Sequence, residues 1–217
     1  MRLILVRHGQ TPANVDGVIE TQHPGPGLTA LGLEQAAAVP EALENERIDS
    51  ISVSTLIRTH LTAAPLAEAL GLTPIERSGL HEIEAGDLEG RTDRVSMHAY
   101  LGPIVRWADG DLTAGIPGAF DGHHFYARFD ASVAEIAAED ASTAVIFSHG
   151  AAIRAWVGGR ASNIDPHFTV DNHLDNTGIA ILDGSPGAGW RLISWAGEPV
   201  DGLVDVFADD PTGDPID

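Results

Sequence analysis

Short apolar runs alternate with longer helical patterns along most of this chain, and that alternation limits the possible folds more than any other feature. The clearest run, at 3–6, is partly β-branched and has no polar face, as in a strand that is buried on both sides. Similar runs at 48–53 and 143–147 are each followed by apolar residues that recur every three or four positions. Strands that alternate with helices predict an α/β fold, here a three-layer sandwich whose mostly parallel central sheet is flanked by helices.

The ends of the predicted elements are marked by capping residues. We predict strands at 3–6, 48–53, 143–147, 178–182 and 190–195, the last two as a possible hairpin, and helices at 29–45, from 54 or 55 to 70, at 92–108, at 122–139 and at 151–157. Thr29 is the expected N-cap of the first helix and Ser54 or Thr55 that of the second, which Gly71 ends.

Neither an internal repeat nor a clear linker divides the chain, so we predict one domain over 1–197. A Gly-rich, weakly periodic stretch at about 85–125 is expected to form a loop–helix insertion over the site. Residues 198–217 are rich in Asp, Gly and Pro and are expected to form an acidic C-terminal tail.

The charge balance excludes several classes of partner. The chain has 12 basic residues, all of them Arg, against 32 acidic residues, and its formal net charge is −20. Such a charge repels nucleic acid and anionic membranes, so neither is expected as a partner, and a phosphorylated ligand must be held by Arg residues gathered in one place. The chain has no Cys, which excludes disulfides, thiolate zinc sites and cysteine nucleophiles. The first apolar run is too short for a signal peptide, and no stretch is long enough for a membrane helix, so we expect a cytoplasmic protein.

Two predicted strands end in similar triplets. The run at 3–6 leads into Arg7-His8-Gly9, and the run at 143–147 leads into Ser148-His149-Gly150. A Gly after the His allows a sharp turn from strand to loop. Functional sites of open α/β sheets lie beyond the carboxyl ends of the strands, so parallel strands would bring both imidazoles to the same edge.

These triplets and four further segments together resemble the histidine phosphatase superfamily, which includes the cofactor-dependent phosphoglycerate mutases. The matching residues are Arg7-His8-Gly9-Gln10-Thr11 with Asn14; Leu28-Thr29 with Gly32 and Gln35-Ala36; Ser54, Leu56, Arg58-Thr59 and Thr62-Ala63; Leu80, Glu82, Gly86 and Glu89-Gly90; and Ser148-His149-Gly150 with Arg154. They occur in the family's order over about 3–154, and Asn176-Thr177-Gly178 extends the match.

The resemblance implies a phosphohistidine mechanism that requires neither metal nor cofactor. His8 would form the phosphohistidine, since imidazole is a competent nucleophile near neutral pH. Arg7, Arg58 and His149 would surround the phosphoryl group. A guanidinium group suits this role because it can donate two parallel hydrogen bonds to phosphoryl oxygens and keeps its positive charge. Asn14 and Thr11 are expected to donate hydrogen bonds to the phosphate.

A general acid is also expected, because the leaving oxygen needs a proton. Glu82 is at the family's acid position, and Glu84, two residues later, is its competitor. If this segment is extended, the two side chains point to opposite faces, and only one of them enters the site. We assign the role to Glu82.

The resemblance leaves the class of reaction open. The family's mutases hold a second, carboxylate-bearing end of the substrate with added basic residues, for which this chain offers Arg91, Arg94, Arg106 and Arg128. This shortage favours a phosphomonoester hydrolase acting on a small phosphorylated molecule; a mutase-type phosphotransferase and a non-catalytic phospho-ligand-binding protein are the alternatives. The physiological substrate and the oligomeric state are not predicted.

Two further expectations concern the walls of the pocket. Trp107, Phe120 and Phe125 are expected to give the pocket an apolar side that suits a bulky or aromatic leaving group. His123-His124 lacks the carboxylate spacing of a metal site and is expected to cap a helix or to line the pocket.

Overall fold

A seven-stranded mixed sheet organises the protein, whose computed structural model describes residues 1–200. The strands are β1 (Arg2–Arg7), β2 (Ser50–Val53), β3 (Ile75–Glu76), β4 (Thr143–Ser148), β5 (Ile179–Ser185), β6 (Gly189–Trp195) and β7 (Glu198–Pro199). Their spatial order is β3-β2-β4-β1-β5-β6-β7. The first four strands of this order pair in parallel, whereas β5, β6 and β7 are added in antiparallel fashion. The α/β class, the parallel core and the predicted β5–β6 hairpin are confirmed.

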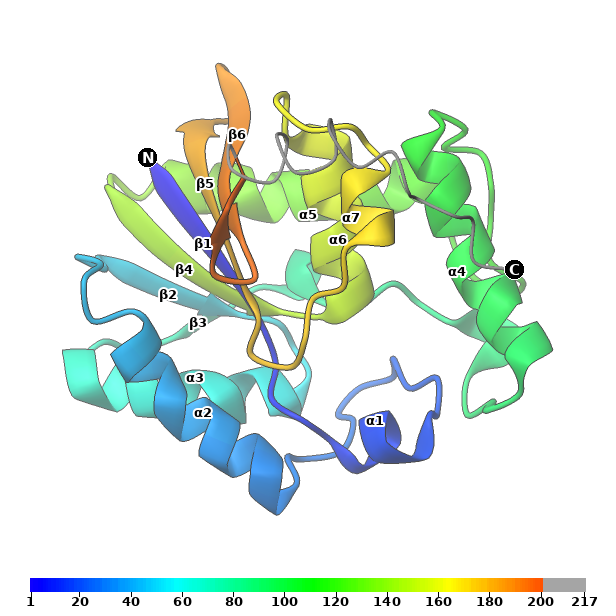
Figure 1. Cartoon of the computed structure of the whole chain (residues 1–217), viewed down its shortest axis with the longest axis horizontal. Coiled ribbons are helices and arrows are strands. Elements are labelled where there is room, and N and C mark those ends of the chain that lie inside the picture. Colours follow the sequence, from blue (N-terminus) through cyan, green and yellow to red (C-terminus); the bar gives the residue numbers. More distant parts are fainter. Residues whose placement is uncertain (201–217) are drawn as a thin grey trace, which may run out of the picture.

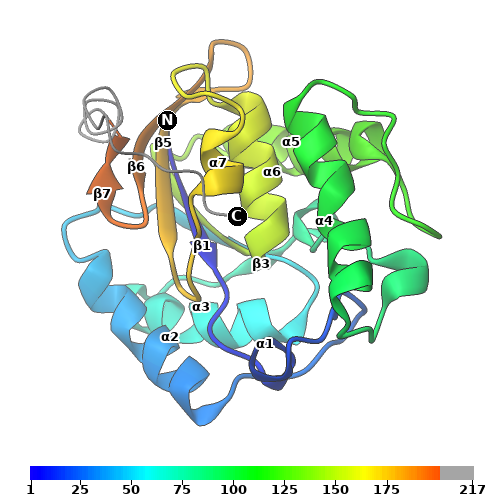
Figure 2. The ribbon, with the colours of Figure 1, turned by 45° about the vertical axis from the view of Figure 1, so that its right-hand side comes forward.

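Helices cover both faces of the sheet, as the sandwich prediction required (Figure 1). They are α1 (Pro12–Asp16), α2 (Ala30–Ala42), α3 (Ile57–Leu70), α4 (Arg94–Ala108), α5 (Gly122–Ala137), α6 (Gly150–Arg160) and α7 (Phe168–Asp171), with short 3-10 turns at Ser78–Leu80 and Gly86–Leu88. Helices α2 and α3 lie on one face, while α5 and α6 lie on the other (Figures 1 and 2). Helix α4, from the predicted insertion, packs against α6 beside the carboxyl ends of the parallel strands (Figure 2).

The side-chain alternation of β1 divides the core into two parts. Leu3 and Leu5 are fully buried against the α5 and α6 side, whereas Ile4 and Val6 are fully buried in the cluster that includes α2 and α3 residues. This is the consequence of the period of two in a strand that both faces of the sheet enclose. The continuous apolar run that opens the chain therefore marks the centre of the molecule.

The predicted caps agree only in part. The Thr29 side chain accepts a hydrogen bond from Gly32 N, and Gly71 ends α3 in the left-handed region at φ 64°. The expectation that Ser54 or Thr55 caps α3 is wrong, because its N-cap is Leu56 and no side chain bonds to the cap. Ser54 Oγ instead accepts from Leu56 N at 3.2 Å while facing the site.

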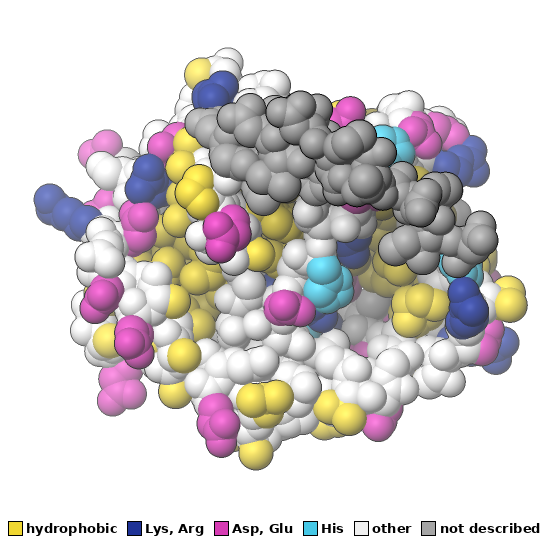
Figure 3. All heavy atoms as spheres, in the orientation of Figure 1, with side chains coloured by type: hydrophobic (Ala, Val, Ile, Leu, Met, Phe, Trp, Pro, Cys, Tyr) yellow, Lys and Arg dark blue, Asp and Glu magenta, His cyan; other side chains and the backbone are white. Residues whose placement is uncertain are grey.

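The ends of the chain differ slightly from expectation. Strand β7 lies within the predicted tail and pairs with β6, and Val200 is buried. Residues 201–217 of that predicted tail lie outside the described residues. Within residues 1–200, no helix combines the length and the apolar character that a membrane crossing needs. The face seen in Figure 3 carries many separate Asp and Glu side chains, as the composition implies.

Candidate active site

The two histidines meet where β1 and β4 end. The strands are parallel neighbours with Arg7 opposite Ser148, and His8 N donates to Ser148 O at 3.0 Å. The ring centroids of His8 and His149 are 5.2 Å apart. The pairing of these two strands therefore brings together two triplets that are 141 positions apart in the chain.

Two glycines let the loop after β1 pass close to α2. A Cβ on Gly9 would lie 2.6 Å from Gly32 O, and a Cβ on Gly32 would lie 2.1 Å from Gln10 O. Both distances are far below a van der Waals contact, so only glycine fits at either position. Gly9 and Gly32 are thus both required at the same close contact between the loop and α2.

The His8 side chain has the tautomer that a nucleophile needs. Its Nδ1 lies 2.8 Å from Gly9 O, and because a carbonyl only accepts, Nδ1 carries the proton and Nε2 keeps its lone pair. The imidazole is buried, and burial, followed by the positive charge of Arg58, lowers the pKa of His8 well below its ordinary value. His8 is consequently neutral near pH 7.

His149 has both ring nitrogens engaged. Arg58 Nε donates to His149 Nδ1 at 3.2 Å, so the neutral ring carries its proton on Nε2, which donates to Ser54 Oγ at 2.7 Å. Burial, and then the charge of Arg58, lowers the pKa of His149 well below the usual range. The ring has no exposed surface and does not line the cavity beside His8, so its contact with the site is the hydrogen bond to the edge of the Arg58 guanidinium.

Arg7 and Arg58 present cations to the same space. Arg7 Nη1 donates to Leu174 O at 2.6 Å, whereas Arg7 Nε is buried and has no hydrogen-bond partner within the described residues. A buried N–H without a partner is costly. The start of α6 passes so close that a Cβ on Gly150 would lie 3.0 Å from that Nε.

Glu20 is a carboxylate of the cavity that sequence reasoning missed. Its Oε2 accepts from Arg58 Nη1 at 2.7 Å, and its carbonyl accepts from Arg58 Nη2 at 3.2 Å. Burial raises the pKa of Glu20, and the neighbouring Arg58 charge opposes that shift. Glu20 lies in a Gly- and Pro-rich stretch without periodicity, so nothing in the pattern distinguished it from a surface acid.

Glu82 and Glu84 face different surroundings, as their spacing suggested. The Glu82 carboxylate lines the cavity and accepts from Ala152 N at 2.8 Å and Ala151 N at 3.2 Å, which are first-turn donors of α6. Glu84 bonds to His81 Nε2 at 2.6 Å and lies 3.6 Å from Arg128. Burial opposes ionisation of Glu84, but the His81 hydrogen bond and the Arg128 charge outweigh it and lower the pKa to about 2.

Arg128 holds the backbone beneath Glu82. Its guanidinium donates to Gly79 O at 2.7 Å, His81 O at 2.8 Å and Glu82 O at 2.8 Å, which are bonds to three carbonyls of one short segment. The side chain is therefore committed to the protein and does not line the cavity. Arg91, Arg94 and Arg106, the other basic candidates of the insertion, do not line it either.

Asn14 and Thr11 form a small unit at the rim. The Asn14 side-chain oxygen accepts from Thr11 N at 3.0 Å and from Asn176 Nδ2 at 3.2 Å, and the Thr11 hydroxyl joins the same capping box at the start of α1. The amide oxygen is thereby used, so a contact to phosphate has to come from the Asn14 amide nitrogen. The hydroxyl of Thr11 serves the cap and orients Asn14.

Many of these residues line one cavity of about 480 Å³. Among the predicted site residues it contains Arg7, His8, Thr11, Asn14, Arg58 and Glu82; it adds Glu20, Tyr100, Arg154, His173 and Asp175, and it excludes His149. Arg154 was recognised in the matched segments, but its place in the cavity was not predicted. Arg7, Arg58 and Arg154 thus place three positive charges around one cavity of a protein whose net charge is strongly negative.

The expected apolar wall is wrong. Trp107 and Phe125 stack on each other inside the core at 3% and 1% exposure, and Phe120 is 58% exposed and stacks on His124. None of the three lines the catalytic cavity. His123 and His124 are also exposed and do not line it; the N-cap of α5 is Asp121, whose side chain accepts from His124 N.

Comparison with known proteins agrees with this architecture. The model of the histidine phosphatase superfamily (branch 1) matches residues 3–197. A PE-PGRS family protein of Mycobacterium tuberculosis is 39% identical over 212 residues, which cover 90% of this chain but only 36% of that protein. The chain therefore spans about a third of the length of that relative.

Two solved structures are similar over nearly their whole length. The mycobacterial glucosyl-3-phosphoglycerate phosphatase in complex with VO3 has a TM-score of 0.75 and 29% identity, covering 90% of this chain and 98% of that one. The phosphoserine phosphatase of Entamoeba histolytica in complex with 3-phosphoglyceric acid has a TM-score of 0.68 and 26% identity, covering 89% and 95%.

Proposed function

This chain belongs to branch 1 of the histidine phosphatase superfamily, and on that premise we propose that it hydrolyses small phosphomonoesters without a metal ion. One observation carries the proposal: the neutral His8 imidazole, its Nε2 lone pair free, lies in a cavity with three guanidinium groups and one carboxylate at the start of a helix. That set suits phosphoryl transfer, which needs positioning and charge neutralisation.

In the first step, His8 Nε2 attacks phosphorus, and a nitrogen–phosphorus bond forms as the bond to the leaving oxygen breaks. Glu82 gives its proton to that oxygen. Arg7 and Arg58 neutralise the phosphoryl oxygens, since both line the cavity together with His8. His149 acts through Arg58.

In the second step, water attacks the phosphohistidine and Glu82 takes the proton of the water. The nitrogen–phosphorus bond breaks, inorganic phosphate leaves, and His8 and Glu82 return to their initial protonation states. Arg154 adds positive charge beside the path of the leaving group.

Hydrolysis is favoured over mutase activity by the distribution of cations. A mutase needs basic groups for a second anionic end of its substrate, but Arg91, Arg94, Arg106 and Arg128 do not line the cavity formed by residues 1–200. The two solved relatives described above are phosphatases of small phosphorylated metabolites by their printed names, which supports the same class for this chain.

The test is hydrolysis of an aryl phosphate by the wild type and by His8→Asn, together with trapping of acid-labile radiolabelled phosphate on the protein. We expect loss of activity and of the label in H8N, and no effect of a chelator on the wild type. Full activity in H8N would overturn the proposal. Isomerisation of a phosphorylated glycerate faster than its phosphate release would replace it with a mutase.

A further inference from the structure

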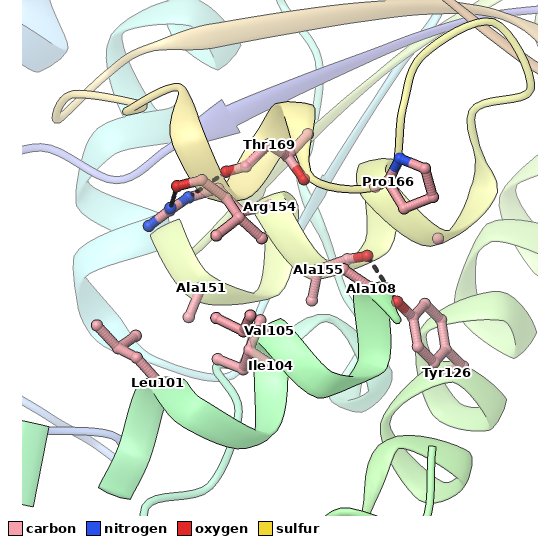
Figure 4. Close-up of a pocket in the computed structure, with 13 residues that line it drawn as sticks. Leu101, Ile104, Val105, Ala108, Tyr126, Ala151, Arg154, Ala155, Pro166 and Thr169 are labelled. Carbon is pink, nitrogen blue, oxygen red and sulfur yellow. Dashed lines mark hydrogen bonds between the residues drawn. The ribbon is translucent and has the colours of Figure 1, made fainter. Parts of the chain in front are cut away.

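A second cavity lies beside the catalytic one, between α4, α6 and the segment that contains α7 (Figure 4). Its volume is about 190 Å³. The walls are mainly aliphatic, with Leu101, Ile104 and Val105 on α4 and Ala155 on α6. An apolar cavity of about 150 Å³ is large enough to bind benzene, so this one can hold a substantial apolar group.

The two cavities are neighbours that share part of their walls. Leu101, Ala151 and Arg154 line both of them, and Figure 4 shows Leu101 and Ala151 at one end of the apolar cavity. Ala151 N also donates to the Glu82 carboxylate, the proposed acid. The boundary between the two cavities is therefore next to the group that would protonate a leaving oxygen.

Arg154 lies at the boundary between the two cavities. Its guanidinium donates to Thr169 O at 2.6 Å and to Val170 O, which fixes the side chain against α7. Arg154 lines both cavities, and the alkyl stem of a long Arg side chain commonly covers apolar surface while its charged end stays in a polar environment. A ligand that spans both cavities would thus meet charge at one end and hydrocarbon beyond it.

The apolar cavity runs along α6. It is lined at one end by Ala151 and farther on by Gly158 and Gly159, and with about 1.5 Å of rise per residue this is a distance of about 10 Å. It is shaped for an elongated group rather than for a compact sugar with many hydroxyls. Polar hydroxyls buried there would lose their hydrogen bonds to water, whereas methylene groups gain by leaving water.

We propose that this apolar cavity binds the apolar part of the leaving group of a phosphomonoester whose phosphoryl group lies at His8. The substrate class is a soluble phosphate ester of a medium-chain alkyl or arylalkyl alcohol. The inference rests on the proposed hydrolase function and extends it to specificity. The occupant follows from the position of the two cavities side by side and from their shared boundary at Ala151, whose backbone N–H bonds to Glu82.

The test is kcat/KM for alkyl phosphates from methyl to octyl with the wild type, Val105→Asp and Val95→Asp. Val105 lines only the apolar cavity, and Val95 is an exposed valine of the same helix that lines neither cavity. In the wild type, kcat/KM should rise about two- to fourfold per methylene, the upper figure being equivalent to ~0.8 kcal/mol. The increase should stop once the alkyl group fills the apolar cavity.

We expect V105D to hydrolyse methyl phosphate with the kcat/KM of the wild type. From methyl to octyl phosphate, the kcat/KM of V105D should then change by less than about twofold. V95D should show the same increase of kcat/KM with alkyl chain length as the wild type. Val105→Thr, which preserves shape, should give an intermediate slope and covers the case in which V105D does not fold.

Three results would overturn the inference: a flat series in the wild type, an unchanged slope in V105D, or an equal loss with methyl and octyl phosphate in V105D. The last would mean that the substitution disturbs the catalytic cavity or the fold rather than the binding of the alkyl group. Failure of the underlying hydrolase function is distinguishable, because no member of the series and no aryl phosphate would then be hydrolysed.

Discussion

Arg58 Nε donates to His149 Nδ1 at 3.2 Å, so the second histidine of the site is an acceptor for a guanidinium edge. The other ring nitrogen of His149, Nε2, donates to Ser54 Oγ. Because both ring nitrogens are engaged and the ring is buried, His149 orients Arg58 toward the cavity.

His149→Ala should lower kcat/KM for an aryl phosphate about 10²-fold, because Arg58 Nε loses its acceptor and the guanidinium loses its fixed orientation. His149→Gln should recover part of the loss, since its amide oxygen can accept from Nε. Steady-state kinetics with both variants, alongside their melting temperatures, separates positioning from unfolding. Equal losses in the two variants with unchanged stability would contradict the positioning role.

Glu82→Gln should reduce kcat/KM for an alkyl phosphate by about 10²- to 10⁴-fold, the usual contribution of a general acid. Its effect on p-nitrophenyl phosphate should be much smaller, because that leaving group departs without a proton. Glu84→Gln is the matched control and should change stability rather than this ratio, since Glu84 bonds to His81 and pairs with Arg128. Identical losses of E82Q on both substrates would remove Glu82 from the acid role.

Glu20→Gln should lower KM for a phosphomonoester about three- to tenfold at neutral pH. The carboxylate is beside Arg58 in the cavity and repels a dianionic substrate, while the amide oxygen of Gln can still accept from Arg58. Glu34→Gln, at an exposed position of α2, is the control for a change in net charge alone. A rise of KM in E20Q would instead assign Glu20 an orienting role that needs its charge.

Stability should fall as the pH drops below about 6.5, the ordinary imidazole pKa. Burial lowers the pKa values of His8 and His149 in the folded protein, so below that pH the unfolded chain binds protons that the folded chain does not. Their contribution is fully present above about pH 6.5 and is lost below it, with a slope of at most ~1.4 kcal/mol per pH unit for each.

Urea denaturation between about pH 7.5 and pH 5 measures this slope. His8→Asn should make the dependence shallower, whereas His98→Asn, at an exposed position, is the control. A slope that is unchanged in H8N would mean that His8 does not titrate differently in the two states.

Gly32→Ala should destabilise the fold by about 1–3 kcal/mol, because its Cβ would lie 2.1 Å from Gln10 O at a backbone contact that cannot yield easily. Gly102→Ala is its counterpart: it lies within α4, with nothing within 4 Å of a Cβ, and should stabilise by up to about 1 kcal/mol. Urea denaturation of both variants tests the pair. A neutral G32A would show that α2 can move away from the loop.

The sequence by itself determined the alternation of strands and helices, the position of β1 in the core and the meeting of His8 with His149. These follow from local patterns: apolar runs specify buried strands, and a His-Gly pair after each of two parallel strands places both imidazoles at one edge. The spacing of two also predicted that Glu82 and Glu84 face different surroundings, whereas the choice of Glu82 as the acid rested on the resemblance to the family's acid position.

The tertiary structure alone decided which groups share the cavity and which way they face. Glu20 and Arg154 enter it, His149 is turned behind Arg58, and Trp107 and Phe125 pack in the core. Each outcome depends on contacts between segments that are far apart in the chain. Such contacts set burial and hydrogen-bond partners without leaving a period or a spacing that the sequence could display.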